Sequence, residues 1–253
     1  MYVYLYDNFL RQKKYESTLK AIETRLTDFG VAGKIVRLQS FTNSEILIQD
    51  EIRRGAKTIV IVGDDDTVAK VLSRSAATDI LFGFIPVGGN NTVAEVLGIP
   101  IGESACTVLS QRRKVKLDIG WVNNRYFISQ LHVPASDIKI EYDEKFTVSS
   151  LNGKMELVVC NLQPFVWKRK GKGDIVVHPQ DGKLEAFLRP AKKKKWFGDK
   201  YEDPSIFPFE EMSVSSYKPF EMEVDGKSSK ETRITIRLAK SKIKMIVGKD
   251  RKF

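Results

Sequence analysis

The sequence has few of the residues that build disulfides and metal sites. Its 253 residues include two cysteines, Cys106 and Cys160, and two histidines, His132 and His178. No cysteine or histidine stands at zinc-ligand spacing, so neither a disulfide framework nor a structural zinc site is expected. The histidines also belong to no Ser/His/Asp order of the kind used in nucleophilic catalysis. Buried, reduced thiols and structural histidines are therefore the expectation.

Long apolar runs are absent too. No stretch approaches the roughly 18 uninterrupted apolar residues that a membrane-spanning helix needs. No charged segment with a long apolar core behind it opens the chain, as it would in a signal peptide. We therefore expect a cytoplasmic protein, and the 42% hydrophobic content is that of a globular chain with a proper core. The net charge of +10 predicts attraction to anions: phosphorylated metabolites, nucleic acid or acidic lipid headgroups.

Apolar patterns in the first half alternate between strand and helix. Helical spacing over 15–29 follows an apolar opening strand and stops at Gly30, and capping-box spacing precedes the helical pattern of 46–52. Further strands are predicted over 57–62 and 81–87, each followed by helical spacing. This βαβαβαβα order predicts a parallel sheet flanked by helices, over residues 1–117.

The period changes near residue 115. Alternating and apolar strand patterns, separated by turn signals such as Asn123-Asn124 and Asp225-Gly226, continue to the C-terminus. No glycine- and serine-rich linker marks the junction. Residues 118–253 are therefore predicted to form a second domain of antiparallel β-structure.

Two glycine turns follow the strands 57–62 and 81–87. Such a turn lets backbone N–H groups approach a phosphate at a helix N-terminus, and both lie at strand carboxyl ends, where open α/β sheets bind ligands. A structural turn in which asparagine tolerates positive φ is the alternative for each. The candidate phosphate-binding residues are Gly63, Asp64, Asp65, Asp66, Thr67, Gly88, Gly89, Asn90, Asn91 and Thr92.

These two turns and several later motifs resemble the catalytic domain of diacylglycerol kinase-like lipid kinases, a family that includes sphingosine kinases and bacterial soluble lipid kinases. Residues 63–67 match the family's Gly-Gly-Asp-Gly-Thr loop, and 86–92 match its Pro-x-Gly-Thr-Gly-Asn-Asp segment. Residues 116–127 are similar to the crossing between the family's domains, 181–184 to its Asp-Gly-x-Leu turn, and 224–227 to its Asp-Gly-Glu motif. The resemblance covers nearly the whole chain, with these motifs in the family's order.

The resemblance implies a Rossmann-like α/β domain that binds ATP with Mg²⁺, followed by a β-sandwich domain, with a lipid hydroxyl as phosphoryl acceptor. It makes Asp225 the general base and Asp65 a metal ligand. Asn8, the remnant of an Asn-Pro-x-x-Gly segment, joins the two glycine turns around the nucleotide phosphates. From the residues alone, Asp225-Gly226 is also an ordinary hairpin turn.

Several residues depart from the family's pattern. Asp64, Asp66 and Asn90 replace glycines, Thr92 replaces an acidic residue, and Lys227 replaces a glutamate. Three functions are compatible with these departures. The chain is a divergent lipid kinase, a kinase with an altered donor such as pyrophosphate, or a catalytically inactive binding or regulatory protein. The altered donor is suggested by a similar Gly-to-Asp change in the phosphofructokinase loop.

Two basic clusters each lie beside aromatic residues, at 165–172 and 192–197. Cations with aromatics favour an acidic membrane surface, and solvated loops are the alternative. Stacking platforms for nucleic acid are not recognisable, so nucleic acid is not an expected partner. The expected partner is a lipid substrate reached by peripheral membrane association, and a homodimer stays open. The candidate membrane-surface residues are Lys192, Lys193, Lys194, Lys195 and Trp196.

Overall fold

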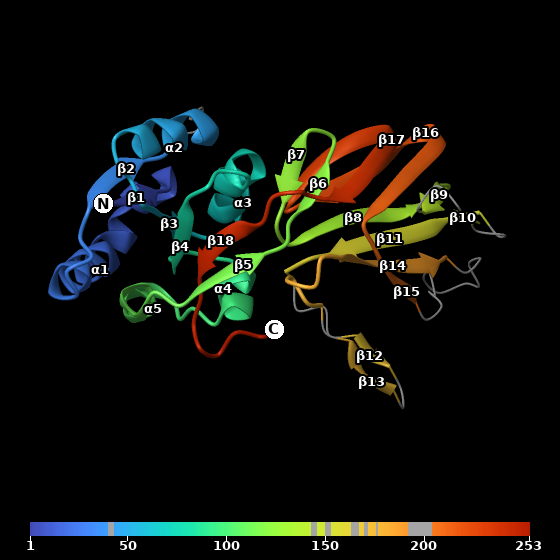
Figure 1. Cartoon of the computed structure of the whole chain (residues 1–253). Coiled ribbons are helices and arrows are strands. Elements are labelled where there is room, and N and C mark those ends of the chain that lie inside the picture. The colour runs from blue at the N-terminus through green and yellow to red at the C-terminus, as the bar shows by residue number, and fades with distance from the viewer. Residues whose placement is uncertain are drawn as a thin grey trace. The chain divides into compact units, whose positions relative to one another are not determined.

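The chain has two compact units, Met1–Leu117 with Ser241–Phe253, and Asp118–Lys240 (Figure 1). The computed structural model describes residues 1–39, 43–142, 146–149, 153–162, 167–169, 172–175, 177–191 and 204–253. The membrane-surface residues predicted at 192–196 lie outside these ranges.

The first unit contains a six-stranded sheet in the order β2-β1-β3-β4-β18-β5. Neighbouring strands run parallel as far as β18, and β5 pairs with β18 antiparallel. The predicted parallel sheet is therefore confirmed except at this edge. The strands are β1 (Tyr2–Tyr6), β2 (Lys34–Arg37), β3 (Thr58–Gly63), β4 (Leu81–Pro86), β5 (Lys114–Leu117) and β18 (Ile243–Ile246).

Helices alternate with these strands, as the period of the apolar residues predicts. Every residue of β3 and β4 is buried, so these strands are continuously apolar, whereas α1 buries only Leu19, Ile22 and Leu26 along one stripe. The helices are α1 (Glu16–Asp28), α2 (Ser44–Arg53), α3 (Asp65–Ser75), α4 (Thr92–Leu97) and α5 (Ala105–Gln111), with 3₁₀ turns η1 (Asn8–Arg11), η2 (Lys13–Tyr15) and η3 (Gly102–Ser104).

The C-terminal residues 241–253 correct the predicted domain boundaries. The sequence predicts a second domain over all of 118–253, but residues 241–253 belong to the first unit. β18 inserts between β4 and β5, and Ile243, Met245 and Ile246 are all fully buried there. The first unit needs this strand because β4 and β5 do not pair with each other. Its short apolar pattern resembles that of the β-strands before it, so the sequence does not distinguish it from them.

The stretch Thr92–Gln111 has the length and apolar composition of a membrane-crossing helix, and half of its most apolar window is buried inside the structure. It is not one straight helix, because α4 ends at Gly98 in the left-handed conformation and α5 begins at Ala105. α4 and α5 contribute Val93, Leu97 and Leu109 to the buried core.

In the second unit, the described strands form a ten-stranded antiparallel sheet and a separate pair, β12 (Trp167–Arg169) with β13 (Lys172–Ile175). The larger sheet has the order β15-β14-β11-β8-β16-β17-β6-β7, and β9 joins β10 to β16. Its strands are β6 (Gly120–Val122), β7 (Arg125–Phe127), β8 (Gln130–Ser136), β9 (Lys139–Tyr142), β10 (Phe146–Ser149), β11 (Met155–Cys160), β14 (Leu184–Pro190), β15 (Ser205–Phe209), β16 (Glu211–Val224) and β17 (Lys227–Leu238).

The second unit has a large apolar core and a smaller cluster around Val158 and Phe187. The large core includes Val122 on β6 and Leu184 on β14, which lie toward opposite ends of the strand order. Because strands so far apart in the sheet share one core, the sheet must curl around it. The register between β16 and β17 shifts between Ser215 and Phe220, and such an irregularity bends a strand. The antiparallel β domain predicted from the sequence is confirmed.

Candidate functional site

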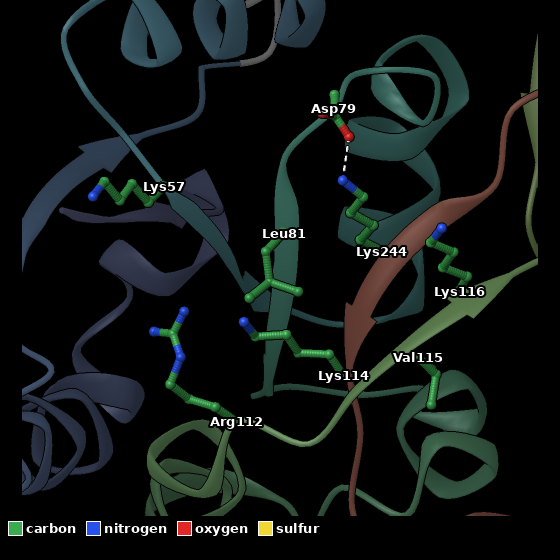
Figure 2. A pocket seen from close by; sticks show the side chains of 8 residues that line it. All are labelled: Lys57, Asp79, Leu81, Arg112, Lys114, Val115, Lys116 and Lys244. Carbon is green, nitrogen blue, oxygen red and sulfur yellow. Dashed lines mark hydrogen bonds and ion pairs between the residues drawn. The ribbon is translucent and has the colours of Figure 1, made fainter.

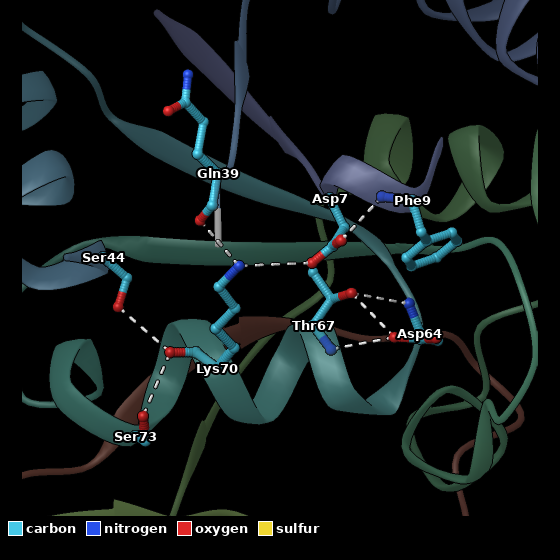
Figure 3. Close-up of polar contacts among 8 residues, drawn as sticks. All are labelled: Asp7, Phe9, Gln39, Ser44, Asp64, Thr67, Lys70 and Ser73. Atoms are coloured by element: carbon cyan, nitrogen blue, oxygen red, sulfur yellow. Dashed lines mark hydrogen bonds and ion pairs between the residues drawn. The ribbon is translucent and has the colours of Figure 1, made fainter. Parts of the chain in front are cut away.

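Three connections meet at the carboxyl edge of the first unit's sheet. They follow β1, β3 and β4, three adjacent strands of the sheet. The chain order reverses between β1 and β3, because β2 lies on the far side of β1. Open α/β sheets bind ligands at such a reversal. Figure 3 shows the connection after β1, with Asp7 and Phe9, beside the start of α3.

The first glycine turn is closed by its own side chains. Asp64 is the N-cap of α3, and its Oδ1 accepts the Thr67 N–H at 3.1 Å and the Thr67 hydroxyl at 2.9 Å. A Cβ on Gly63 would lie 2.3 Å from Thr67 Oγ1, so only glycine fits there. The acidic residue that replaces a family glycine therefore caps the helix that a phosphate would otherwise approach.

Asp65 joins the two glycine turns. Its Oδ2 accepts the Thr92 N–H at 2.7 Å and its Oδ1 the Val93 N–H at 3.1 Å, which caps the start of α4. Its own N–H donates to the Asn90 carbonyl oxygen at 2.9 Å. Burial raises the pKa of the Asp65 carboxyl, and the hydrogen bonds from Val93 and Thr92 oppose that rise. Both carboxylate oxygens of Asp65 already accept backbone hydrogen bonds. The role of Asp65 as a metal ligand stays a prediction.

The second glycine turn is more open than the first. The N–H groups of residues 88–91 donate to none of the described residues, and a Cβ on Gly89 would meet nothing within 4 Å. Gly88 has φ of 113°, and a Cβ there would lie 2.9 Å from the Phe9 ring and 3.7 Å from Asp64 Oδ2. Asn91 holds this turn through Nδ2, which donates to the Gly89 carbonyl oxygen at 3.1 Å, while its buried Oδ1 has no partner among the described residues.

The charge around these turns is mostly negative. Asp66 is exposed beside Asp64 and Asp65, and no lysine or arginine occurs in either turn. Positive charge nearby comes from Lys70 on α3. Its Nζ lies 3.9 Å from Asp7 Oδ2 and 3.2 Å from the Gln39 carbonyl oxygen (Figure 3). A phosphate group bound at these turns would lie closer to carboxylates than to a cation. Like charges repel unless a metal ion neutralises them.

The nucleotide and Mg²⁺ implied by the resemblance fit one part of this arrangement. The N–H groups at the starts of α3 and α4 already donate to the carboxylates of Asp64 and Asp65, so phosphate groups have no place there. The N–H groups of residues 88–91 donate to none of the described residues, so they are the ones left to bind a phosphate. No described group of three or more His, Cys, Asp or Glu side chains can hold a metal ion. Mg²⁺ commonly takes one or two carboxylates plus substrate phosphates, so a metal ion here would depend on the bound nucleotide for part of its ligands.

Asp225 belongs to the second unit. It forms with Gly226 the two-residue turn between β16 and β17, with φ of 45° and 79°, so the predicted hairpin turn is present. Its Oδ2 accepts the Ile128 N–H at 2.8 Å, and its Oδ1 accepts the N–H groups of Ser129 and Gln130, both at 3.0 Å. Burial raises the pKa of the Asp225 carboxyl, and these hydrogen bonds oppose the rise. The side chain is therefore a fixed, half-buried carboxylate.

The structure brings most of the predicted site residues together at one sheet edge. Both glycine turns lie there, and Asn8 is exposed on η1 beside Phe9. Two further residues lie at this edge that the sequence does not predict: Phe9, whose ring contacts the Gly88 position, and Asp7, which caps η1. Their signal was their place directly after the first strand, at the same edge as the glycine turns. Asp225 lies in the other unit.

Comparisons with known proteins support the fold described above. Residues 3–122 match the family model of the diacylglycerol kinase catalytic domain. A crystal structure of a diacylglycerol kinase from Bacillus anthracis str. Sterne has a TM-score of 0.77 at 18% identity, covering 99% of this chain and 97% of its own. Two further structures from that organism have the same TM-score of 0.77 at 17% identity, covering 98% of this chain and 98% and 97% of theirs.

At these identities the solved structures establish a shared fold over both units. No curated protein matches the chain. The family match implies use of a nucleotide in general, and the family acts on lipids. Residues 3–122 are thus similar to the diacylglycerol kinase catalytic domain, and the whole chain shares the fold of solved structures described as diacylglycerol kinases.

Proposed function

We propose that the chain is a lipid kinase that transfers a phosphoryl group from ATP to a lipid hydroxyl, with Asp225 as the general base. The observation that carries this proposal is the anchored Asp225 carboxylate. Three backbone hydrogen bonds fix it, and burial raises its pKa. A general base must be held within reach of the proton it accepts, and a raised pKa makes it a stronger base.

The two oxygens of Asp225 are not equivalent. Among the described residues, Oδ1 accepts two hydrogen bonds and Oδ2 accepts one. Oδ2 therefore keeps lone-pair capacity for the hydroxyl of a lipid. As the lipid oxygen bonds to the γ-phosphorus, the bond from that phosphorus to the β,γ-bridging oxygen breaks and ADP leaves, while the hydroxyl proton passes to this carboxylate. Bound ATP with Mg²⁺ would supply the phosphoryl group, with its phosphates against the N–H groups of residues 88–91.

A catalytically inactive binding protein is the second candidate, and the first glycine turn favours it. Asp64 fills the start of α3, and Asp66 adds an exposed negative charge beside it. Both features oppose a polyphosphate. In this case the chain keeps the fold without phosphoryl transfer.

Calorimetric titration with ATP, and separately with pyrophosphate, each with Mg²⁺, decides between the candidates. Saturable ATP binding supports the kinase, and binding of pyrophosphate alone supports an altered donor. Binding of neither supports the inactive protein. A double Asp64→Gly, Asp66→Gly variant should then gain ATP affinity, because it restores the family glycines and removes two negative charges.

Once turnover of a lipid acceptor is measured, Asp225→Asn tests the base. We expect a loss of about 10²-fold or more in kcat, as for removal of a general base. Asparagine tolerates the left-handed conformation, so the turn itself should persist. Asp137→Asn, an exposed change in the same unit, is the matched control. Unchanged turnover in a correctly folded Asp225→Asn protein would remove Asp225 from the mechanism.

The lipid acceptor places this reaction at a membrane surface. We propose that Lys192 to Lys195 and Trp196 serve that contact, which the net charge of +10 supports. Replacing the four lysines by glutamine should weaken sedimentation with acidic liposomes. Sedimentation equal to that of the unmodified protein would make this cluster ordinary solvated surface.

A further inference from the structure

A basic cavity of about 570 Å³ lies on the first unit, away from the two glycine turns (Figure 2). Lys57 directly precedes β3 and Leu81 begins β4, so the cavity lies at the amino ends of these strands. The glycine turns follow the carboxyl ends of the same strands. The lining residues are Lys57, Asp79, Leu81, Arg112, Lys114, Val115, Lys116 and Lys244.

Five of these eight residues are cations and one is an acid. They come from four separate parts of the chain: the start of β3, the start of β4, the segment 112–116 and β18. Folding therefore gathers the positive charge here, whereas a single basic run in the sequence would be ordinary solvated surface. In Figure 2, several of the basic side chains surround the start of β4.

Two of the lysines lie directly opposite each other on neighbouring strands. Lys116 of β5 and Lys244 of β18 are direct partners in the antiparallel register. Like charges directly opposite each other destabilise a sheet, so this pair costs stability unless anions lie nearby. Asp79 supplies one anion, since its carboxylate forms an ion pair with Lys244. This ion pair lowers the pKa of the Asp79 carboxyl, and the charge of Lys116 lowers it further.

The single carboxylate does not balance the other cations. Arg112 donates to the Tyr2 hydroxyl and lies over its ring at 5.3 Å. Lys57 and Lys114 are exposed, and neither side chain has a partner among the residues that the structure describes. Leu81 and Val115 add apolar surface to the same cavity. The lining thus combines unpaired ammonium groups with a hollow of the size that small-molecule sites have.

We propose that this cavity binds a compact anion carrying two or more phosphate groups, either free in solution or displayed as a phospholipid headgroup. Ammonium groups bind phosphate oxygens as point charges, and several of them around one hollow match several phosphates. The site is separate from the phosphoryl-donor turns, so the proposal does not depend on the chain being an active kinase.

The test uses the full chain and two charge-matched double variants. The first, Lys57→Gln with Lys114→Gln, removes the unpaired cations of the cavity. The second, Lys13→Gln with Lys20→Gln, removes two exposed charges at and beside α1 and leaves the same net charge. All four side chains are exposed, so both proteins should fold like the unmodified chain.

Tripolyphosphate without magnesium is the soluble probe, followed by calorimetry. We expect saturable binding that the cavity variant weakens by about tenfold or more, since two charge-assisted contacts are lost, and that the control variant changes by less than about twofold. Flotation with cardiolipin-containing vesicles, against pure phosphatidylcholine vesicles, is the second arm. Cavity-dependent binding of tripolyphosphate alone identifies a soluble ligand, and cavity-dependent binding of vesicles identifies a headgroup.

The proposal is overturned by either of two results. One is that neither probe binds the unmodified chain. The other is that the cavity and control variants lose affinity equally, since attraction by the net charge of the whole surface would then explain the binding.

Discussion

At the scale of single residues, Glu185 on β14 carries the clearest pH dependence. Its Oε2 is buried without a hydrogen-bond partner among the described residues. Burial, together with the nearby Asp181 carboxylate, raises the pKa of this carboxyl from 4.5 to about 7. Because the folded pKa lies above the unfolded one, the folded state favours the protonated form. Its stabilisation is complete below about pH 4.5 and is lost as pH rises through about 7.

We therefore expect the second unit to lose about 1–3 kcal/mol of unfolding free energy between pH 4.5 and pH 8 through Glu185. Glutamine at this position cannot ionise, so Glu185→Gln should be more stable than the unmodified protein at pH 8 and nearly equal to it at pH 4.5. Urea unfolding followed by tryptophan fluorescence measures this, because all three tryptophans lie within 118–240. A constant difference between the two proteins across this range would contradict the assignment.

The positions of the acidic site residues could be predicted from the sequence, but their contacts could not. The motif order indicated that Asp64, Asp65 and Asp225 belong to turns after strands. Each carboxylate then accepts backbone N–H groups, in the case of Asp65 and Asp225 from residues 27 to 97 positions away. Such contacts depend on how strands pair in space, which neither periodicity nor turn chemistry determines.

At the scale of secondary-structure elements, Asp65 is the side chain that links α3 to α4. α4 has six residues, too few to be stable alone, and its first N–H groups donate to this carboxylate. We expect Asp65→Ala to lower the free energy of unfolding by about 1–3 kcal/mol, because two partly buried N–H groups lose their acceptor. Amide exchange of residues 92–97 should become faster before the rest of the first unit is affected.

Asp66→Ala is the matched control for this change. Asp66 neighbours Asp65 on α3 but is exposed, so its removal should alter stability by only a few tenths of a kcal/mol, through the helix dipole. If both variants lost the same free energy of unfolding, the negative charge at the start of α3 would explain the stabilisation, and the link to α4 would not.

Elements with a clear period were the predictable part of the fold. The alternating strands and helices of 1–117 are confirmed because each buries a face whose spacing is visible in the sequence. β18 was assigned to the wrong unit, because a short apolar strand fits any sheet equally well. The basic cavity was not foreseen either, since its lysines come from separate segments that meet only through the β4-β18-β5 pairing.

At the scale of the whole molecule, the first unit is closed by the last segment of the chain. The polypeptide leaves this unit at Leu117 and returns at Ser241, and β18 completes the sheet between β4 and β5. Met245 is fully buried in β18, and Met222 is fully buried in the core of the second unit. These two methionines therefore allow one matched core truncation in each unit.

We expect Met245→Ala and Met222→Ala each to cost about 2–5 kcal/mol, the usual range for emptying a buried methionine site. The consequences should differ in location. Hydrogen exchange in Met245→Ala should accelerate in β4 and β5, although β4 is more than 150 residues away in sequence, because β18 pairs with both. In Met222→Ala it should accelerate in β16 and the strands paired with it. Accelerated exchange of 118–240 in Met245→Ala, with β4 and β5 still protected, would contradict the assignment of the C-terminal segment to the first unit's cooperative core.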